Sequence, residues 1–205
     1  LLNSNKVKSD AFYQTALPDG KGAASKLLAF HIENGGISRF EKFNYFFSEI
    51  LSEKNYEQSL ASALDTFSLY CNQGIIECEM SPNLIVLLNR LRTLGKKVFV
   101  VSGGHQEELR SIFSTRKLDI LFEGIFGSPD DKVKILNREI SSREIILPAI
   151  FFGDSRYDFE AAHRCGLDFI FVSDWTEFEE WPEFCADKNI RPITRLDDLL
   201  MNSLI

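Results

Sequence analysis

The sequence predicts an α/β protein in which a parallel, doubly wound sheet follows a block of helices. Short apolar runs at residues 97–101, 149–152 and 169–172 end in polar residues or glycine, and helical patterns lie between them. Such alternation is typical of parallel sheets that are covered by helices on both faces. Residues 6–77, in contrast, show helical periodicity only. With 44% hydrophobic residues, the chain of 205 residues can bury a sizeable core.

The helical block is expected to form a small bundle. Helices are predicted at residues 6–17 and 23–33, and a fourth runs from about residue 56 to residue 74. The third helix opens at Ser38, which can form a capping box with Glu41, and it carries a stripe of phenylalanines on one face. Stripes of this kind are far more typical of helix packing than of a cofactor site.

The elements after residue 78 follow one another in alternation. A helix is expected to begin with Ser81 as its N-cap and Pro82 at its first position, and to end at Gly95. Beyond it, the expected strands are residues 97–101, 124–127, 149–152 and 169–172, and the expected helices are residues 105–115, 131–140, 157–165 and 196–200.

Composition excludes several classes of partner. The net charge of -7 and the pI of about 5.1 argue against binding to the phosphate backbone of nucleic acids. No apolar stretch is long enough to cross a membrane, and no signal peptide is visible. The four cysteines form no C-x-x-C pair, which favours reduced, mostly buried thiols in a cytoplasmic protein. Nothing in the sequence indicates the oligomeric state.

Two carboxylates follow the apolar run at residues 149–152. Asp154 comes directly after the strand and Gly153, and Asp158 lies in the first turn of the next helix. Ligands of open α/β sheets bind outside the carboxyl ends of the strands, so both side chains can face one site. Carboxylate oxygens suit Mg²⁺ better than zinc or copper. The alternative is that the two aspartates only cap the helix, where Asp is favoured in any case.

The run Ser102-Gly103-Gly104 ends the strand at residues 97–101. A hydroxyl and two unhindered backbone N–H groups at a helix N-terminus form a natural cradle for an anion. The alternative is a plain turn with serine as the helix cap. The run is not a G-x-G-x-x-G fingerprint, so a dinucleotide site has little support.

A lysine begins the helix at residues 131–140. Lys132 lies where a positive charge opposes the helix dipole, a placement that an anionic site would explain. Lys134 lies on another face and is expected to be exposed, and exposure is also the alternative for Lys132. Taken together, Ser102, Lys132 and the pair Asp154 and Asp158 could supply the hydroxyl, the cation and the metal ligands that phosphoryl transfer requires.

These motifs, in this order and spacing, resemble the second, third and fourth motifs of the haloacid dehalogenase-like (HAD) hydrolase superfamily. The resemblance extends over nearly the whole chain. It implies a Rossmann-like three-layer core with a parallel sheet, formed by residues 1–5 and 78–205, and an inserted all-helical (C1-type) cap domain at residues 6–77. It also implies Mg²⁺ and hydrolysis of phosphomonoesters through an aspartyl-phosphate.

One motif of the family is missing from the chain. The nucleophile and the acid/base of the family are aspartates of a D-x-D-G-T motif at the end of the first, central strand, and residues 1–5 resemble the stretch that follows this motif. Asp10 and Asp19 do not follow an apolar strand, so neither replaces it. Loss of a central strand would expose two strand edges. We therefore expect a fragment that is inactive by itself.

The resemblance implies a role for each candidate residue. Ser102 and the amides of Gly103 and Gly104 would hold phosphate oxygens, and Lys132 would neutralise charge on the nucleophile and the phosphoryl group. Asp154 would bind Mg²⁺, and Asp158 would bind it or orient its waters. The substrate would be a small phosphorylated metabolite, such as phosphoglycolate or a sugar phosphate.

Other functions stay open at this point. A catalytically inactive module that binds a phosphorylated ligand or a protein needs no nucleophile. Related proteins include mutases, phosphonate hydrolases, which need a cap lysine such as Lys26 or Lys42, and dehalogenases, which use no Mg²⁺. In the cap, His31, Arg39 and Lys42 are candidates to contact the leaving group, although an exposed helix face explains them equally well. His105 and His163 are expected to be structural.

Overall fold

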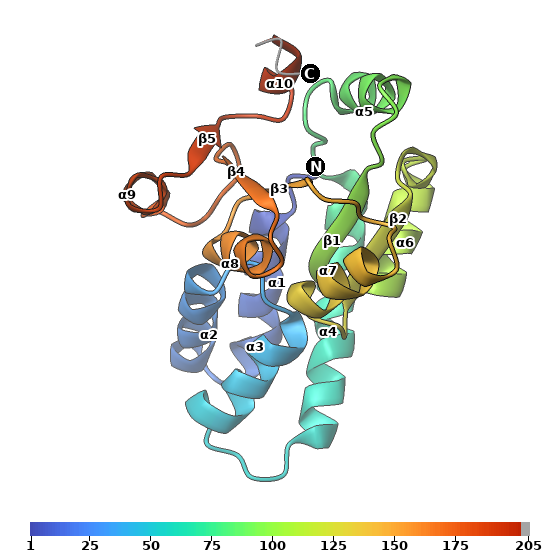
Figure 1. Ribbon diagram of the computed structural model, residues 1–205. Coiled ribbons are helices and arrows are strands. Elements are labelled where there is room, and N and C mark those ends of the chain that lie inside the picture. Colours follow the sequence, from blue (N-terminus) through green and yellow to red (C-terminus); the bar gives the residue numbers. More distant parts are fainter. Residues whose placement is uncertain (202–205) are drawn as a thin grey trace.

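The computed structural model describes residues 1–201 and contains two parallel sheets (Figure 1). One sheet pairs β1 with β2, and the other has the order β3-β4-β5. The strands are β1 (Phe99–His105), β2 (Gly124–Ser128), β3 (Ile150–Gly153), β4 (Asp168–Val172) and β5 (Arg191–Ile193). The predicted α/β class with parallel pairing is therefore confirmed.

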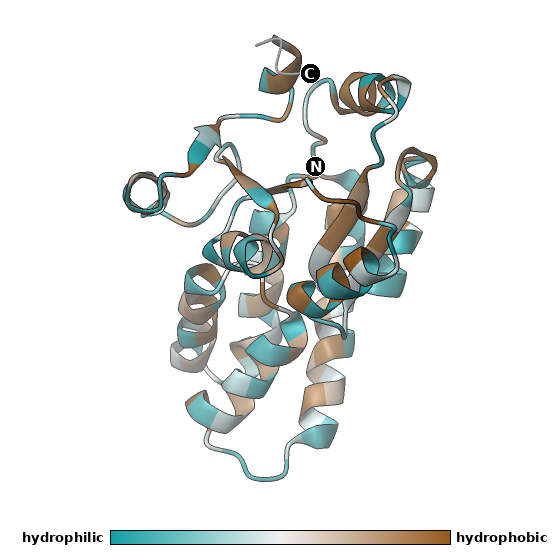
Figure 2. Cartoon of the chain, viewed as in Figure 1, coloured by the Kyte–Doolittle hydropathy of each residue, from teal (hydrophilic) through white to brown (hydrophobic). Residues whose placement is uncertain are grey.

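Helices cover both faces of the strands, as expected from the alternation. On one face, α7 (Lys132–Ser141) and α8 (Arg156–Arg164) pack on side chains of β1, β3 and β4. On the other face, α6 (Gln106–Thr115) packs on β1 and β2, and α5 (Leu84–Thr93) packs near β4 and β5. Figure 2 shows that β1 and β3 are strongly hydrophobic, which is typical of strands in parallel sheets.

The two sheets are separated by a gap between β1 and β3. No residue pair of the described chain joins these two strands in a ladder. Ile150 and Phe152 on β3 are 52% and 36% exposed, which is unusual for apolar residues of a parallel strand. The amino terminus lies at this gap (Figure 1), where Leu2 forms an isolated antiparallel bridge with Met80. Two strand edges are thus left without partners, as the missing central strand predicts.

The helical block lies at the carboxyl ends of β1 and β3 (Figure 1). It comprises α1 (Asn5–Ala16), a 3₁₀ turn at Leu17–Asp19, α2 (Lys21–Glu33), α3 (Arg39–Tyr45), a π-helical turn at Phe46–Ile50, and α4 (Glu57–Glu77). Its own apolar cluster centres on Phe12, Phe43 and Phe67, whose rings contact one another. The phenylalanine stripe therefore packs the bundle, as predicted.

Helix starts are set by side-chain caps at three places. Ser38 accepts the N–H of Glu41 at 3.2 Å and so confirms the predicted capping box. Asp131 and Ser155 cap α7 and α8 in the same way. The predicted cap at Ser81 is wrong, because α5 begins at Leu84 after Asn83, whose left-handed backbone turns the chain into the helix.

Two other predictions about secondary structure need correction. β1 continues through Ser102-Gly103-Gly104 to His105, because this segment pairs further along β2, and α6 starts only at Gln106. β5 was not expected, since Arg191-Pro192-Ile193 has no apolar run. The remaining helices are α9 (Trp181–Asp187), a 3₁₀ turn at Asp119–Leu121 and α10 (Asp198–Met201). Within the described part of the chain, no helix is both long and apolar enough to cross a membrane.

Cysteine burial agrees with the sequence. Cys71, Cys165 and Cys185 are buried, and Cys78 is half-buried. Burial raises the pKa of the Cys71 thiol to about 12, so this side chain stays protonated at neutral pH.

An ion pair joins the helical block to the core. Arg39 on α3 is 6% exposed, and its guanidinium donates to Glu108 on α6 at 2.5 Å and to Ser68 on α4 at 3.0 Å. Ser68 also donates to the second carboxylate oxygen of Glu108 at 2.9 Å. A guanidinium as buried as this one needs its anion, because removing one partner of a buried pair leaves an uncompensated charge.

We predict that Glu108→Gln lowers the free energy of unfolding by roughly 1–3 kcal/mol, because Arg39 would lose its charged partner. Glu107→Gln, on the same helix, removes an exposed pair with Arg110 and should cost less than about 1 kcal/mol. Urea unfolding of the two variants measures the difference. Equal effects would show that the Arg39 pair is no more important than a surface contact.

Candidate functional site

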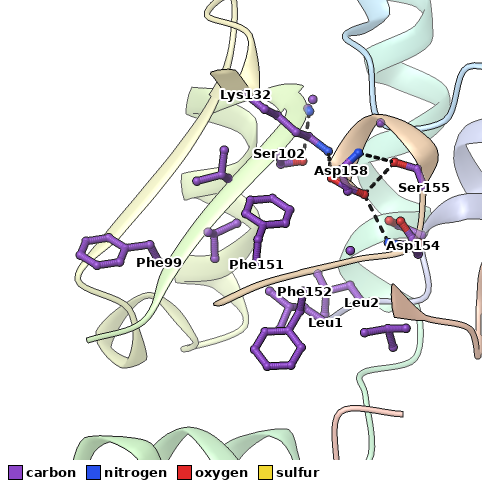
Figure 3. Close-up of a pocket in the computed structure, with 18 of the residues that line it drawn as sticks. Leu1, Leu2, Phe99, Ser102, Lys132, Phe151, Phe152, Asp154, Ser155 and Asp158 are labelled. Carbon is purple, nitrogen blue, oxygen red and sulfur yellow. Dashed lines mark hydrogen bonds and ion pairs between the residues drawn. The ribbon is translucent and has the colours of Figure 1, made fainter. Parts of the chain in front are cut away.

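A cavity of about 1060 Å³ lies between the helical block and the strands (Figure 3). Ser102 from β1, Lys132 from α7, Asp154 from the end of β3 and Asp158 from α8 all line it. The structure thus brings together the residues that the sequence singled out from three separate segments. The same cavity extends along both unpaired strand edges, where Leu1, Leu2 and Phe152 line it.

Asp158 is the most connected side chain of the site. Its Oδ1 accepts from the Lys132 ammonium, and its Oδ2 accepts from the Ser155 hydroxyl at 2.7 Å and from the Asp154 N–H at 3.3 Å. Asp158 and Lys132 are only 4% and 5% exposed. Both carboxylate oxygens therefore already have protein partners. In this arrangement Asp158 orients its neighbours, and it would have to exchange a partner in order to coordinate a metal.

Gly153 permits this arrangement. A side chain at this position would collide with the Cβ of Asp158, because α8 folds back tightly over the end of β3. The turn from strand to helix is stabilised by Ser155, which accepts the N–H of Asp158 at 3.2 Å. The alternative role of the aspartates as helix caps therefore belongs to Ser155, whose side chain accepts the backbone N–H of Asp158.

Asp154 is held by residues far away in the sequence. Asn5 donates from its side-chain amide to Asp154 Oδ2 at 2.9 Å and to the Trp175 carbonyl at 2.8 Å. The Thr176 hydroxyl donates to the Asp154 carbonyl at 2.6 Å. Burial, together with the nearby charge of Asp158, raises the pKa of Asp154. No ion pair involves Asp154 among the described residues, so its charge has no direct cationic partner.

Asp154 fits the chemistry of a hard cation. A buried carboxylate whose pKa is raised by burial is stabilised as an anion when a cation binds beside it. The oxygen donors at hand are those that Mg²⁺ prefers. The set is not complete in the described chain, however, because nowhere in residues 1–201 do three or more His, Cys, Asp or Glu side chains gather as a metal cluster. A cation here would need at least one further ligand.

Lys132 and Lys134 occupy different surroundings. The Lys132 ammonium lies inside the site, whereas Lys134 is exposed and pairs with Asp130 at 2.5 Å. The predicted exposure of Lys134 is therefore confirmed. Gly36, in the loop after α2, lies against the side chains of Lys132 and Ser155. A Cβ at Gly36 would lie 3.2 Å from Lys132 Nζ and 2.6 Å from Ser155 Oγ. The positive φ of 89° and this close approach together require glycine.

Ser102 differs from the expected anion cradle in one respect. Its Oγ accepts the N–H of Gly104 at 3.1 Å, and both residues belong to β1 rather than to a helix N-terminus. The amide of Gly104 therefore has an internal partner, while the Ser102 hydroxyl proton stays free to be donated. Gly103 packs against the helical block, since a Cβ there would lie 2.6 Å from the Gly36 carbonyl.

The helical block contributes its own polar groups. Lys42 Nζ lies 2.6 Å from His31 Nδ1, and both residues are buried and line the cavity. Burial and the charges of Lys8 and Lys132 lower the pKa of Lys42 to about 7. Arg39 is instead the partner of Glu108. All three predicted contacts to the leaving group, His31, Arg39 and Lys42, thus line the cavity, and Arg39 is already paired there.

Several residues of the site were not expected from the sequence. Lys8 and Asn5 enter it from α1, and Glu177 enters from the loop after β4. Ser155 could have been identified, because Ser155-Arg156-Tyr157-Asp158 has the spacing of a capping box. Asn5 and Glu177 carry no such local signal, since only the fold brings them to Asp154 and His31. His163 stacks on Phe159, in line with the structural role expected for it. His105 stands at the N-cap position of α6 without a side-chain cap bond, and it lines the cavity.

Comparisons with known proteins agree with this geometry. The sequence profile of the haloacid dehalogenase-like hydrolase family matches residues 1–172. A predicted phosphoglycolate phosphatase from Haemophilus somnus has a similar structure, with a TM-score of 0.74 and 16% identity over 99% of this chain and 93% of that one. CbbY from Rhodobacter sphaeroides, solved with phosphate, gives a TM-score of 0.69 and 16% identity over 97% and 91%. No curated protein sequence matches the chain.

We predict that Lys42 makes stability depend on pH above neutrality. Its pKa falls from 10.5 to about 7 on folding, so between these values the unfolded state binds more protons, and raising the pH stabilises the fold. From pH 7 to pH 10 the contribution of Lys42 should be roughly 2–4 kcal/mol. It should be lost in Lys42→Met, whereas the contribution of Lys8, whose pKa burial also lowers, should stay. Urea unfolding across this range measures it, with Lys26→Met, an exposed cap lysine, as control. Identical slopes for the wild type and Lys42→Met would contradict the prediction.

Proposed function

Because the chain belongs to the haloacid dehalogenase-like hydrolase family, we propose that it acts in Mg²⁺-dependent hydrolysis of a small phosphomonoester, such as phosphoglycolate or a sugar phosphate. The observation that carries the proposal is the convergence of Ser102, Lys132 and Asp154 on one cavity beneath the helical block. A hydroxyl donor, a buried ammonium and a carboxylate without a cationic partner match the needs of a phosphoryl group. The names of the similar structures support the same class.

Each residue has a defined task in this proposal. The Ser102 hydroxyl donates to a phosphate oxygen, since its own oxygen is already bonded by the Gly104 N–H. Lys132, held by Asp158 and covered by Gly36, neutralises charge on the phosphoryl oxygens. Asp154 holds Mg²⁺, which when bound supplies further positive charge beside the phosphate. The helical block excludes water from the cavity.

We further propose that a strand in the gap between β1 and β3 supplies the nucleophile. Both edges of the gap are unpaired, and Leu1 lies beside it, so a segment preceding Leu1 could enter the gap directly. A carboxylate at its carboxyl end would reach the space between Ser102 and Asp154. It would attack phosphorus while the ester P–O bond breaks and the leaving oxygen takes a proton from the second aspartate of the D-x-D motif. Water, deprotonated by that aspartate, would then hydrolyse the acyl phosphate to phosphate and carboxylate. Without this strand, residues 1–205 would be inactive.

A second candidate is a module that binds a phosphorylated ligand without turnover. The observation that favours it is that both oxygens of Asp158 have protein partners, so Asp158 is not free to act as a nucleophile beside Asp154. The two candidates differ in one measurable quantity, which is phosphate release by a chain that includes the strand.

We predict that a version extended upstream of Leu1, carrying a strand that ends in D-x-D-G-T, releases phosphate from generic monoesters in the presence of Mg²⁺. Lys132→Ala should lower kcat/KM by at least about 100-fold, since a buried cation next to the phosphoryl group would be lost. The control Lys134→Ala, which changes a side chain on the exposed side of α7, should leave kcat/KM unchanged. Unchanged activity of Lys132→Ala would contradict the charge role proposed for Lys132, and an inactive extended chain would favour the binding module.

We predict that Mg²⁺ raises the thermal unfolding temperature of the 205-residue chain, because a ligand that binds only the folded state stabilises it. Asp154→Asn should abolish this shift. Asp174→Asn, which changes an exposed carboxylate at the same edge, should retain it. A shift that persists in Asp154→Asn would show that the cation binds elsewhere.

A further inference from the structure

The cavity contains a second polar cluster, and the proposed phosphoryl transfer assigns no role to the residues of this cluster. It consists of His31 and Lys42, from α2 and α3, and of Glu177 from the loop after β4. Ser9 Oγ lies 2.9 and 2.8 Å from the two carboxylate oxygens of Glu177 and fixes that side chain. The cluster lies on the cap side of the cavity, where the leaving group of a phosphomonoester would extend.

The protonation of His31 follows from its neighbours. Lys42 is a donor and also contacts the His31 carbonyl at 3.3 Å, so Nδ1 of the imidazole accepts the 2.6 Å hydrogen bond. Burial, with the charges of Lys42 and Lys8, lowers the pKa of His31 to about 2, which keeps the ring neutral. The remaining nitrogen, Nε2, must therefore carry the proton.

This Nε2–H donor has no hydrogen-bond partner within the described chain, although His31 is only 7% exposed. Glu177 Oε2 lies 3.9 Å from it, too far for a direct hydrogen bond. A buried donor without an acceptor costs free energy, so a partner from outside the protein is expected. A donor and an acceptor side by side match a group that both accepts and donates, as a hydroxyl does.

We propose that His31 and Glu177 bind a hydroxyl of the substrate, so that the leaving group is a polyol or sugar rather than a carboxylic acid. The hydroxyl accepts from His31 Nε2 and donates to Glu177. This inference rests on the proposed function and chooses between the two substrate classes named there.

The charges of the cluster support this choice. Burial and the charges of Lys8 and Lys132 lower the pKa of Lys42 to about 7, and Glu177 is the anion that opposes this shift, so the negative charge beside His31 is that of Glu177. A substrate carboxylate beside His31 Nε2 would also lie close to Glu177 and be repelled by it. A hydroxyl meets no such penalty, and its bond to a carboxylate is of the stronger, charge-assisted kind.

The test compares two esters that differ at one carbon. Glycerol 3-phosphate has a terminal hydroxymethyl group where 3-phosphoglycerate has a carboxylate. Calorimetric titration of the 205-residue chain with Mg²⁺ should give at least about tenfold tighter binding of glycerol 3-phosphate. Glu177→Gln should remove most of this preference, and Glu179→Gln, which alters an exposed neighbour, should keep it. Inorganic phosphate, which lacks a leaving group, should bind all three proteins equally.

Each outcome decides one of the two proposals. Equal or tighter binding of 3-phosphoglycerate by the wild type, or an unaltered preference in Glu177→Gln, overturns the hydroxyl site while phosphate binding upholds the proposed function. If inorganic phosphate does not bind, the proposed function fails and the hydroxyl site fails with it. A circular dichroism spectrum of Glu177→Gln establishes that the variant is folded, which the partial exposure of Glu177 favours.

Discussion

The buried ion pair between Lys132 and Asp158 is the interaction on which the site depends. It joins the start of α7, which follows β2, to the first turn of α8, which follows β3, and so it connects the two separate sheets across their gap. A pair as buried as this is stabilising only when its remaining groups are satisfied. Ser155 and the Asp154 N–H provide those bonds. The same contacts that hold the sheets in place therefore aim the ammonium into the cavity.

The gap between β1 and β3, in contrast, leaves polar backbone groups of two strand edges without strand partners in the described part of the chain. Helices cover both faces of the strands, so apolar residues such as Phe99 and Phe151 are packed on one side by α7 and α8. The facing edges of β1 and β3 have no strand partner among residues 1–201, and Ile150 and Phe152, on the face of β3 opposite Phe151, stay exposed. Burial of faces does not satisfy backbone N–H and C=O groups at an edge, which only another strand can pair. The fold thus has helical layers suited to a wider sheet than the described residues form.

The sequence predicted those parts of the site that have local signals. Apolar runs located three strands, and Ser102, Lys132 and Asp154 were found because each follows a strand or begins a helix. The caps were harder to assign, since Asp and Ser are both good N-caps, although the spacing of Ser155 and Asp158 is that of a capping box and the structure places Ser155 as the cap of α8. Asn5, Lys8 and Glu177 could not be predicted. Their places depend on how distant segments pack, which periodicity does not encode.

Selection of the substrate must depend on how the helical block meets the core. Gly36 and Gly103 allow the two parts to approach at backbone distance, and the Arg39 pair with Glu108 fixes their relative position. In this closed arrangement His31 lies near Glu177, which belongs to the core, so the polar cluster exists only when the two parts are together. A ligand that bridges these two side chains would therefore favour closure, since it binds the closed arrangement more tightly than an open one. Recognition of the leaving group and exclusion of water would then be the same event.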